Sequence, residues 1–309
     1  MSSRTASSSP PGRSVLALFG PTASGKTAVA GIVRERLGAE VISVDSAAIY
    51  EGLPVLTAAP PYSARLAGVV PLADEISVGD FQRLAHAAVD ETLAAGRLPL
   101  LVGGTGLYLR AAISAFPLPP PPEPGRRAFW QAEYDRLGAE AAHALLAGRD
   151  ARAAARVHAN DRRRVVRALE LFEVGASLAP TSDRLWAEDT RQPTTIVGLD
   201  VPLDELDRRI EERARAMVAQ GAVDEARRAW ALPLSATARK VLGLEQFATL
   251  PEGEAVAAVA QATRRLARYQ RKWLRRIPAA VTLDGTRPAE ELADEIIALA
   301  GAREHLPRH

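Results

Sequence analysis

The chain of 309 residues carries a formal net charge of +2, and 47% of its residues are hydrophobic, which is typical of a globular protein. It contains no cysteine, and this excludes disulfides, a thiolate nucleophile and cysteine-ligated zinc. No apolar run approaches the ~18 residues that a membrane-spanning helix needs, and the five histidines lack the spacing of zinc ligands. We therefore expect a cytoplasmic protein with no membrane partner.

Strands alternate with helices in the first third of the chain. The first 13 residues have no apolar segment of the signal-peptide kind and are expected to form a disordered tail. Apolar runs and helical periodicity then predict strand 15–19, helix 26–37, strand 41–44, helix 81–95 and strand 98–102. This alternation predicts a parallel sheet with functional loops at the carboxyl ends of its strands.

A proline-rich segment at 117–124 interrupts the alternation. A proline run is stiff and extended and cannot form the interior of a helix, so it predicts a hinge or a domain boundary. Residues 126–176 have a helical pattern and few strand signals. One more strand is expected at 195–199, followed by helices at 203–230 and 254–276.

The segment GPTASGKT at 20–27 fits the phosphate-binding pattern G-x-x-x-x-G-K-[ST], between a predicted strand and a predicted helix. Glycines let backbone amides turn inward, and the helix N-terminus adds positive potential. We expect Lys26 to reach the terminal phosphate and Thr27 to hold Mg²⁺. The predicted diphosphate-binding residues are Gly20, Thr22, Ala23, Ser24, Gly25, Lys26 and Thr27.

This P-loop completes the fold prediction. The fold class is α/β, with a P-loop core of parallel strands flanked by helices and an all-α insertion domain. The core is expected to comprise residues 14–116 and 190–301, and the insertion residues 117–189.

Polar loops follow the second and third predicted strands. Asp45 could bind Mg²⁺ through water, cap a helix or act as a general base, and its spacing favours the first two roles. The segment Gly103-Gly104-Thr105-Gly106 stands where an ATPase usually has an acidic residue, which argues against a generic NTPase. A turn into a helix capped by Thr105 is the simplest interpretation of this segment.

Arginines cluster in two predicted helices. Arg163 and Arg167 lie one turn apart in the first, and residues 264–276 of the second contain seven basic side chains and no acid. A solvated helix face usually explains such a run, but an unbalanced stripe suits the phosphate backbone of a nucleic acid. The expected stripe is Arg264, Arg268, Arg271 and Arg275, opposite Leu266, Tyr269, Trp273 and Ile277.

Several segments occur in a specific order along the chain. They are GPTASGKT, VISVDSAAIYEG, LPLLVGGTGLYLRA, HANDRRRVVRALELFEVG, IEERARAMVAQGAVDE and ATRRLARYQRKWLRR. From about Val15 to Arg276 this set resembles the tRNA dimethylallyltransferases (isopentenyl-tRNA transferases). The fourth segment resembles that family's H-x-N-D-x-x-R-x-x-R-A-L-E signature. Many enzymes share the P-loop, whereas the ordered set is specific.

The resemblance implies transfer of a dimethylallyl group from dimethylallyl diphosphate to the exocyclic amine of the adenine beside the anticodon of tRNA. It implies that Asp45 is the general base for this amine, that Thr105 forms a hydrogen bond at the reaction centre and that Arg213 holds the diphosphate. On its own, Arg213 would be interpreted as a surface arginine. The resemblance also implies a need for Mg²⁺ but not for ATP hydrolysis. Lys26, the ion and the loop amides would offset the charge that ionisation leaves on the diphosphate.

The resemblance further implies a monomer that binds the anticodon stem-loop of tRNA, whose unpaired bases are the cheapest to extrude. In the family the tRNA contacts the Asp45 loop, the helix with Arg163 and Arg167, and a segment that corresponds to 240–246. Together with the basic stripe, the predicted tRNA-binding residues are Asp45, Ser46, Ala47, Ala48, Thr105, Arg126, Arg163, Arg164, Arg167, Lys240, Gly243, Gln246, Arg268 and Arg271.

The chain departs from the family pattern near the expected phosphate and tRNA sites. The family's G-T-A-K-P reads Leu56-Thr57-Ala58-Ala59-Pro60, and its G-Y-[RK] reads Gly243-Leu244-Glu245.

Three other functions are compatible with the sequence. They are a prenyltransferase of free adenine nucleotides, a P-loop small-molecule kinase and an RNA-binding protein whose P-loop has lost its chemistry.

Overall fold

The computed structural model describes residues 14–115, 123, 125–179 and 184–304, which divide into two compact units. The larger unit takes in the chain up to residue 115 and from residue 188 onward, and the smaller unit residues 116–187. The expected disordered tail and nearly all of the expected hinge at 117–124 lie outside the described residues. None of the helices in the described ranges is long and apolar enough to span a bilayer.

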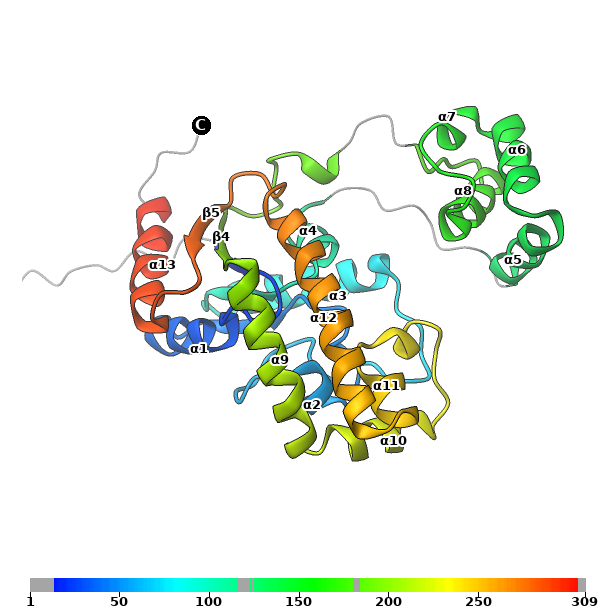
Figure 1. The fold of residues 1–309 in the computed structure, drawn as a ribbon. Helices are drawn as coiled ribbons and strands as arrows, with labels where there is room; N and C mark the ends of the chain where they lie inside the picture. Colours follow the sequence, from blue (N-terminus) through cyan, green and yellow to red (C-terminus); the bar gives the residue numbers. More distant parts are fainter. Residues whose placement is uncertain (1–13, 116–122, 124, 180–183, 305–309) are drawn as a thin grey trace, which may run out of the picture. The chain divides into compact units, whose positions relative to one another are not determined.

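A five-stranded parallel sheet forms the centre of the larger unit (Figure 1). In spatial order its strands are β2 (Glu40–Ser43), β3 (Pro99–Gly103), β1 (Val15–Phe19), β4 (Thr194–Asp200) and β5 (Val281–Asp284). The α/β prediction is confirmed, and the four predicted strands agree to within one residue at each end. The sequence analysis missed β5, where Leu283 is the one buried side chain of four.

Helices surround this sheet. In the described part of the larger unit they are α1 (Lys26–Leu37), α2 (Pro54–Thr57), α3 (Val78–Ala94), α4 (Gly106–Ile113), α9 (Leu203–Ala219), α10 (Ala222–Trp230), α11 (Leu244–Thr249), α12 (Glu252–Leu274) and α13 (Ala289–Glu304). The short helices α2 and α11, and also α13, were not predicted.

Helices cover both faces of the sheet because side chains alternate along each strand. Leu16 and Leu18 of β1 and Leu199 of β4 belong to one apolar cluster with α1 and α13. Gly198 therefore points to the opposite face, where α12 packs. A Cβ added to Gly198 would lie 2.2 Å from Cδ1 of Leu274, so only a glycine allows α12 to come this close.

Local signals decide two helix boundaries that differ from the prediction. The helix expected at 203–230 is divided into α9 and α10 by Gly221, whose φ of 91° lies in the left-handed region. Helix α3 begins three residues earlier than expected because Ser77 and Asp80 form a capping box. The Ser77 hydroxyl accepts the amide of Asp80 at 3.1 Å, and the Asp80 carboxylate accepts the amide of Ser77 at 3.0 Å.

The smaller unit is helical in its described residues. Its α-helices are α5 (Arg126–Leu137), α6 (Ala139–Arg149), α7 (Ala151–Ala154) and α8 (Arg162–Glu173). Trp130, Tyr134, Leu146 and Leu169 are buried in one apolar cluster that these helices share. This unit therefore has a hydrophobic core of its own.

The close approach of α12 to α4 gives a test of this packing. A Cβ added to Gly106 would lie 2.3 Å from the Trp273 indole, whereas one added to Gly253 meets nothing within 4 Å. We expect Gly106→Ala to lower the free energy of unfolding by about 1–3 kcal/mol through overpacking. Gly253→Ala, the matched control in α12, should be neutral or slightly stabilising. Urea unfolding followed by circular dichroism measures both, and equal midpoints would contradict this account.

Candidate active site

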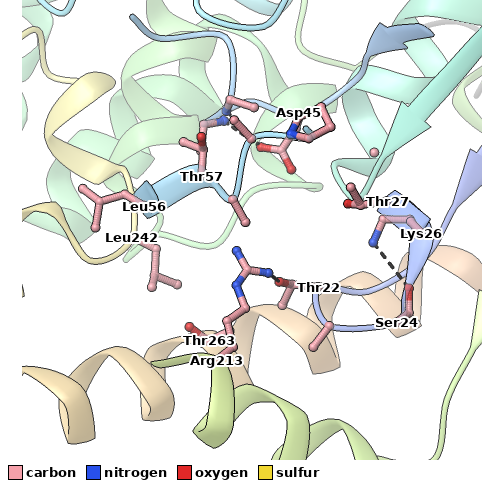
Figure 2. Close-up of a pocket in the computed structure, with 18 of the residues that line it drawn as sticks. Thr22, Ser24, Lys26, Thr27, Asp45, Leu56, Thr57, Arg213, Leu242 and Thr263 are labelled. Atoms are coloured by element: carbon pink, nitrogen blue, oxygen red, sulfur yellow. Dashed lines mark hydrogen bonds between the residues drawn. The ribbon is translucent and has the colours of Figure 1, made fainter. Parts of the chain in front are cut away.

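Three loops meet at the carboxyl edge of the sheet. The P-loop follows β1, the glycine-rich loop at 103–106 follows β3, and Asp45 follows β2. Because β3 pairs with both β1 and β2, these loops are neighbours. They line one end of a cavity of about 450 Å³, into which Asp45, Lys26 and Arg213 project (Figure 2). This places the predicted P-loop and two of the three predicted catalytic residues around one space.

The P-loop is compact because its glycines accept close neighbours. A Cβ on Gly20 would lie 2.8 Å from the Leu199 carbonyl oxygen, and Gly25 has a φ of 86°. Ala23 also has a positive φ, 64°, which is uncommon for a residue with a side chain and costs about 1 kcal/mol. All the predicted diphosphate-binding residues except Gly20 line the cavity.

Lys26 lies in this loop, and no acid of the described residues forms an ion pair with it. Its Nζ donates to the Pro21 carbonyl oxygen at 2.5 Å and lies 3.4 Å from the Ser24 hydroxyl. Burial lowers the pKa of Lys26 to about 7; Asp45 opposes this shift, and Arg213 adds to it. An anion in the cavity would restore the charged form.

Arg213 reaches the cavity from α9 and is half-buried. Its Nη1 donates to Oγ1 of Thr22 in the P-loop at 2.9 Å (Figure 2). Burial lowers the pKa of Arg213, and the nearby charge of Asp45 opposes this effect. The interpretation of Arg213 as a surface residue, drawn from helix position alone, is therefore wrong.

Asp45 orders its own loop. Its Oδ1 accepts the amide of Ala47 at 2.8 Å and that of Ala48 at 3.3 Å. Residues 46–49 form turns, so Asp45 caps a turn rather than the helix that one interpretation expected.

Thr105 connects the loops after β2 and β3. It precedes α4, but its side chain forms no capping hydrogen bond there, contrary to the simplest interpretation of the sequence. Instead its Oγ1 accepts the amide of Ser46 at 3.2 Å and lies 3.3 Å from the Ser46 hydroxyl. Thr105 and Asp45 thus fix the same loop from two directions.

The end of the cavity away from the P-loop is mainly apolar. Helix α2, whose sequence departs from the family pattern, contributes Leu56 to this wall (Figure 2). The buried Glu225 holds α2 in place, since its carboxylate accepts the amides of Val55 at 3.0 Å and Leu56 at 2.8 Å. Further apolar lining residues are Ile210, Ala214, Met217, Val241, Leu242, Val259 and Leu266.

Gln270 is a lining residue that the sequence analysis missed. It belongs to α12, is only 4% exposed, and accepts the amide of Thr22 through Oε1 at 2.7 Å. One signal in the sequence could have found it. Gln270 is the one amide side chain in the run 264–276, whose other residues are arginine, lysine, aromatic or aliphatic.

Three of the four arginines of the predicted basic stripe pair with acids in the fold. Arg264 pairs with Glu211 at 2.6 Å, Arg268 with Asp207 at 2.9 Å, and Arg271 with Asp200 at 2.5 Å. Acids of α9 and β4, distant in sequence, supply the missing charge. An unbalanced charge no longer supports the binding of nucleic acid by Arg268 and Arg271, which stays a prediction. The expected opposite face is not uniform either, since Tyr269 is 59% exposed.

The other predicted tRNA-binding residues have varied surroundings. Lys240 is exposed, and Gln246 accepts the amide of Gly243 at 3.1 Å as part of the cap of α11. In the smaller unit Arg163 and Arg164 are exposed. Two others in that unit form ion pairs, Arg167 with Glu170 at 3.0 Å and Arg126 with Glu173.

Comparison with known proteins identifies the family. Residues 48–277 match the sequence model of the family described as IPP transferase. The chain belongs to this family. It is 38% identical over 306 residues to the tRNA dimethylallyltransferase of Acidothermus cellulolyticus, covering 94% of this chain and 95% of the relative. It is 40% identical over 274 residues to the tRNA dimethylallyltransferase of Anaeromyxobacter dehalogenans, and this match covers 85% of this chain and 90% of the relative.

A solved structure agrees with this placement in the IPP transferase family. The full-length tRNA isopentenylpyrophosphate transferase of Bacillus halodurans is 29% identical, with a TM-score of 0.67. The match covers 96% of this chain and 100% of that protein. The resemblance inferred from the motifs is thereby confirmed.

The pKa of Lys26 gives a pH-dependent prediction. With a pKa of about 7, most of Lys26 is neutral at pH 8 in the free protein, and we expect binding of inorganic diphosphate to raise this pKa. The contribution of Lys26 to affinity is complete below pH 7 and is lost as the pH rises above 7. We expect calorimetry in two buffers of different ionisation enthalpy to show proton uptake at pH 8 that Lys26→Met removes. Equal uptake by both proteins would contradict this assignment, because titration of diphosphate itself is common to them.

Proposed function

We propose that this protein transfers a dimethylallyl group from dimethylallyl diphosphate to N6 of the adenine adjacent to the anticodon of tRNA. One observation carries the proposal, namely the division of the cavity into a P-loop end and an apolar end. An isoprenoid diphosphate has the same division into an anionic head and a hydrocarbon tail. The names of the relatives, tRNA dimethylallyltransferase, support this function.

The residues of the cavity can perform each part of this transfer. The P-loop amides, Lys26 and Arg213 would bind the diphosphate, and their positive charge would stabilise it as the allylic C–O bond breaks. The adenine nitrogen would bond to the allylic carbon, and Asp45 would accept its proton. Among the hydrogen bonds of the described residues, Asp45 uses only Oδ1, so Oδ2 is available as the base.

The residues at the cavity fit Mg²⁺. Thr27 is exposed and lines the P-loop end, and Asp45, in the loop after β2, lines the same cavity. Within the described ranges no group of three or more His, Cys, Asp or Glu could hold a metal ion. Mg²⁺ usually keeps several waters and takes other ligands from substrate phosphates, so a single hydroxyl of the protein can serve as its ligand. We propose that the Thr27 hydroxyl would hold the ion, which would supply positive charge that neutralises the diphosphate.

The tRNA-binding face of α12 is proposed to differ from the predicted stripe. Arg265, Tyr269 and Lys272 are exposed and follow one another at helical spacings of four and three residues. Arg265 and Lys272 have no acidic partner among the described residues. We propose that these two cations, with the Asp45 loop and Lys240, contact the anticodon stem-loop. We further propose that the protein acts as a monomer in the cytoplasm, where its tRNA substrate occurs.

The proposal is tested by a transfer assay with labelled dimethylallyl diphosphate, Mg²⁺ and unmodified tRNA. Parallel reactions contain AMP as acceptor, or ATP in place of dimethylallyl diphosphate. Label in tRNA alone is expected. Label in AMP would favour a prenyltransferase of free nucleotides, and phosphate transfer from ATP would favour a kinase. No transfer by a folded protein that binds tRNA would refute the enzymatic function.

Asp45→Asn tests the general base. The amide oxygen of asparagine can still accept the amides of Ala47 and Ala48, so the loop should keep its shape, but the side chain can no longer take a proton. We expect turnover to fall by about 10²–10⁴-fold with little change in the Kd for tRNA. Turnover equal to that of the wild type would exclude Asp45 as the base.

The proposed tRNA-binding face is tested by removing cations of α12 that have no acidic partner among the described residues and comparing the effect with removal of a paired one. The Arg265→Ala/Lys272→Ala double variant should weaken tRNA binding and reduce the slope of log K against log salt by about one per side chain. Arg268→Ala is the matched control, because its charge is already balanced by Asp207. Filter binding at several salt concentrations measures both. If Arg268→Ala instead changed the slope of log K against log salt more than the double variant did, the originally predicted stripe would be the tRNA-binding face.

A further inference from the structure

We propose that Gln270 is a substrate-binding residue that donates a hydrogen bond from Nε2 to an oxygen of the diphosphate. The inference rests on the proposed function and adds a neutral donor to the P-loop, Lys26 and Arg213. Sequence patterns did not single out this residue, because its environment exists only when α12 lies against the sheet.

The orientation of the Gln270 side chain is fixed by the P-loop. The Thr22 amide is a donor, so the atom that it contacts at 2.7 Å must be the carboxamide oxygen Oε1. The nitrogen Nε2 is therefore the other arm of the amide. A side chain that is 4% exposed and held in this way cannot exchange the two ends without losing its bond to Thr22.

Nε2 has no hydrogen-bond acceptor in the described part of the chain. The atom is open to the cavity, because it is not among the enclosed side-chain atoms of the described residues that lack a partner. Gln270 lines the cavity, so a ligand can supply this partner. Space for Nε2 is provided by Gly104, where an added Cβ would lie 2.4 Å from Nε2 and 3.0 Å from the Gly20 carbonyl oxygen.

The position favours the diphosphate over other ligand groups. Gln270 binds the amide of Thr22, and Arg213 binds the hydroxyl of the same residue at 2.9 Å. The two side chains thus approach one residue of the phosphate-binding loop from α12 and α9. A neutral donor is suited to this place, because Arg213 already lowers the pKa of Lys26 and a third cation would lower it further.

Gln270→Glu separates ligand binding from a purely structural role. The variant keeps an oxygen for the Thr22 amide, but it replaces the donor with a carboxylate that repels the diphosphate. We expect the Kd for inorganic diphosphate with Mg²⁺, measured by calorimetry at pH 8, to rise at least about tenfold. The KM for dimethylallyl diphosphate should rise similarly while the KM for tRNA stays unchanged. Gln261→Glu is the control, since it adds the same charge at an exposed position of α12.

A structural clamp alone predicts the opposite ranking. Gln270→Met removes both arms of the amide, so under that alternative it would be the impaired variant and Gln270→Glu would bind diphosphate like the wild type. That ranking, or a rise confined to the KM for tRNA, would overturn the proposal. Thermal unfolding shows whether each variant is folded. If Gln270→Met does not fold, the diphosphate affinity of Gln270→Glu alone decides between the two accounts. Failure of the wild type to bind diphosphate would instead refute the proposed function.

Discussion

The close packing of α12 against the sheet is the constraint on which the candidate site depends. Gly198 and Gly106 leave room for Leu274 and Trp273, and Gly104 leaves room for Gln270. With these contacts α12 comes near enough for Gln270 to bind the amide of Thr22 in the P-loop. The glycines after β3 therefore have a packing role in addition to forming a turn, and one helix positions both the loop after β1 and the loop after β3.

The charges of the cavity are balanced for an anion that is not part of the chain. Lys26 and Arg213 share one small space, and burial lowers the pKa of each. Asp45 is the acid that opposes both shifts, but it also accepts two amides of its own loop. A diphosphate would relieve the repulsion between the two cations, so substrate binding and charge compensation are the same event. Asp45 can therefore lie near the phosphate site without neutralising both cations, and a charge remains for the diphosphate to compensate.

Local patterns in the sequence were sufficient for much of the fold but for less of the site. The P-loop prediction needed only the residues at 20–27, and the strands β1 and β2 on either side of it are short, mainly apolar and almost wholly buried runs. β5 was missed because a short edge strand with one buried side chain has no such signal. The stripe on α12 was misinterpreted for a different reason. Its partners Asp200, Asp207 and Glu211 belong to other elements, and no local charge count includes them.

The departures from the family pattern at 56–60 can be understood from their place at the cavity. Leu56 stands where the family usually has glycine; its side chain lines the apolar wall, and its Cδ2 lies 3.0 Å from the position of a Cβ on Gly243. Ala59 replaces a lysine on the same wall. The first change adds hydrocarbon surface where an isoprenoid tail would lie, and the second removes a charge that such a tail cannot use. Glu225 accepts the backbone amides of Val55 and Leu56, so this anchor of α2 does not involve the side chains of the two residues. In this chain these departures thus fall on the apolar end of the cavity, whereas the P-loop end has the complete G-x-x-x-x-G-K-[ST] pattern.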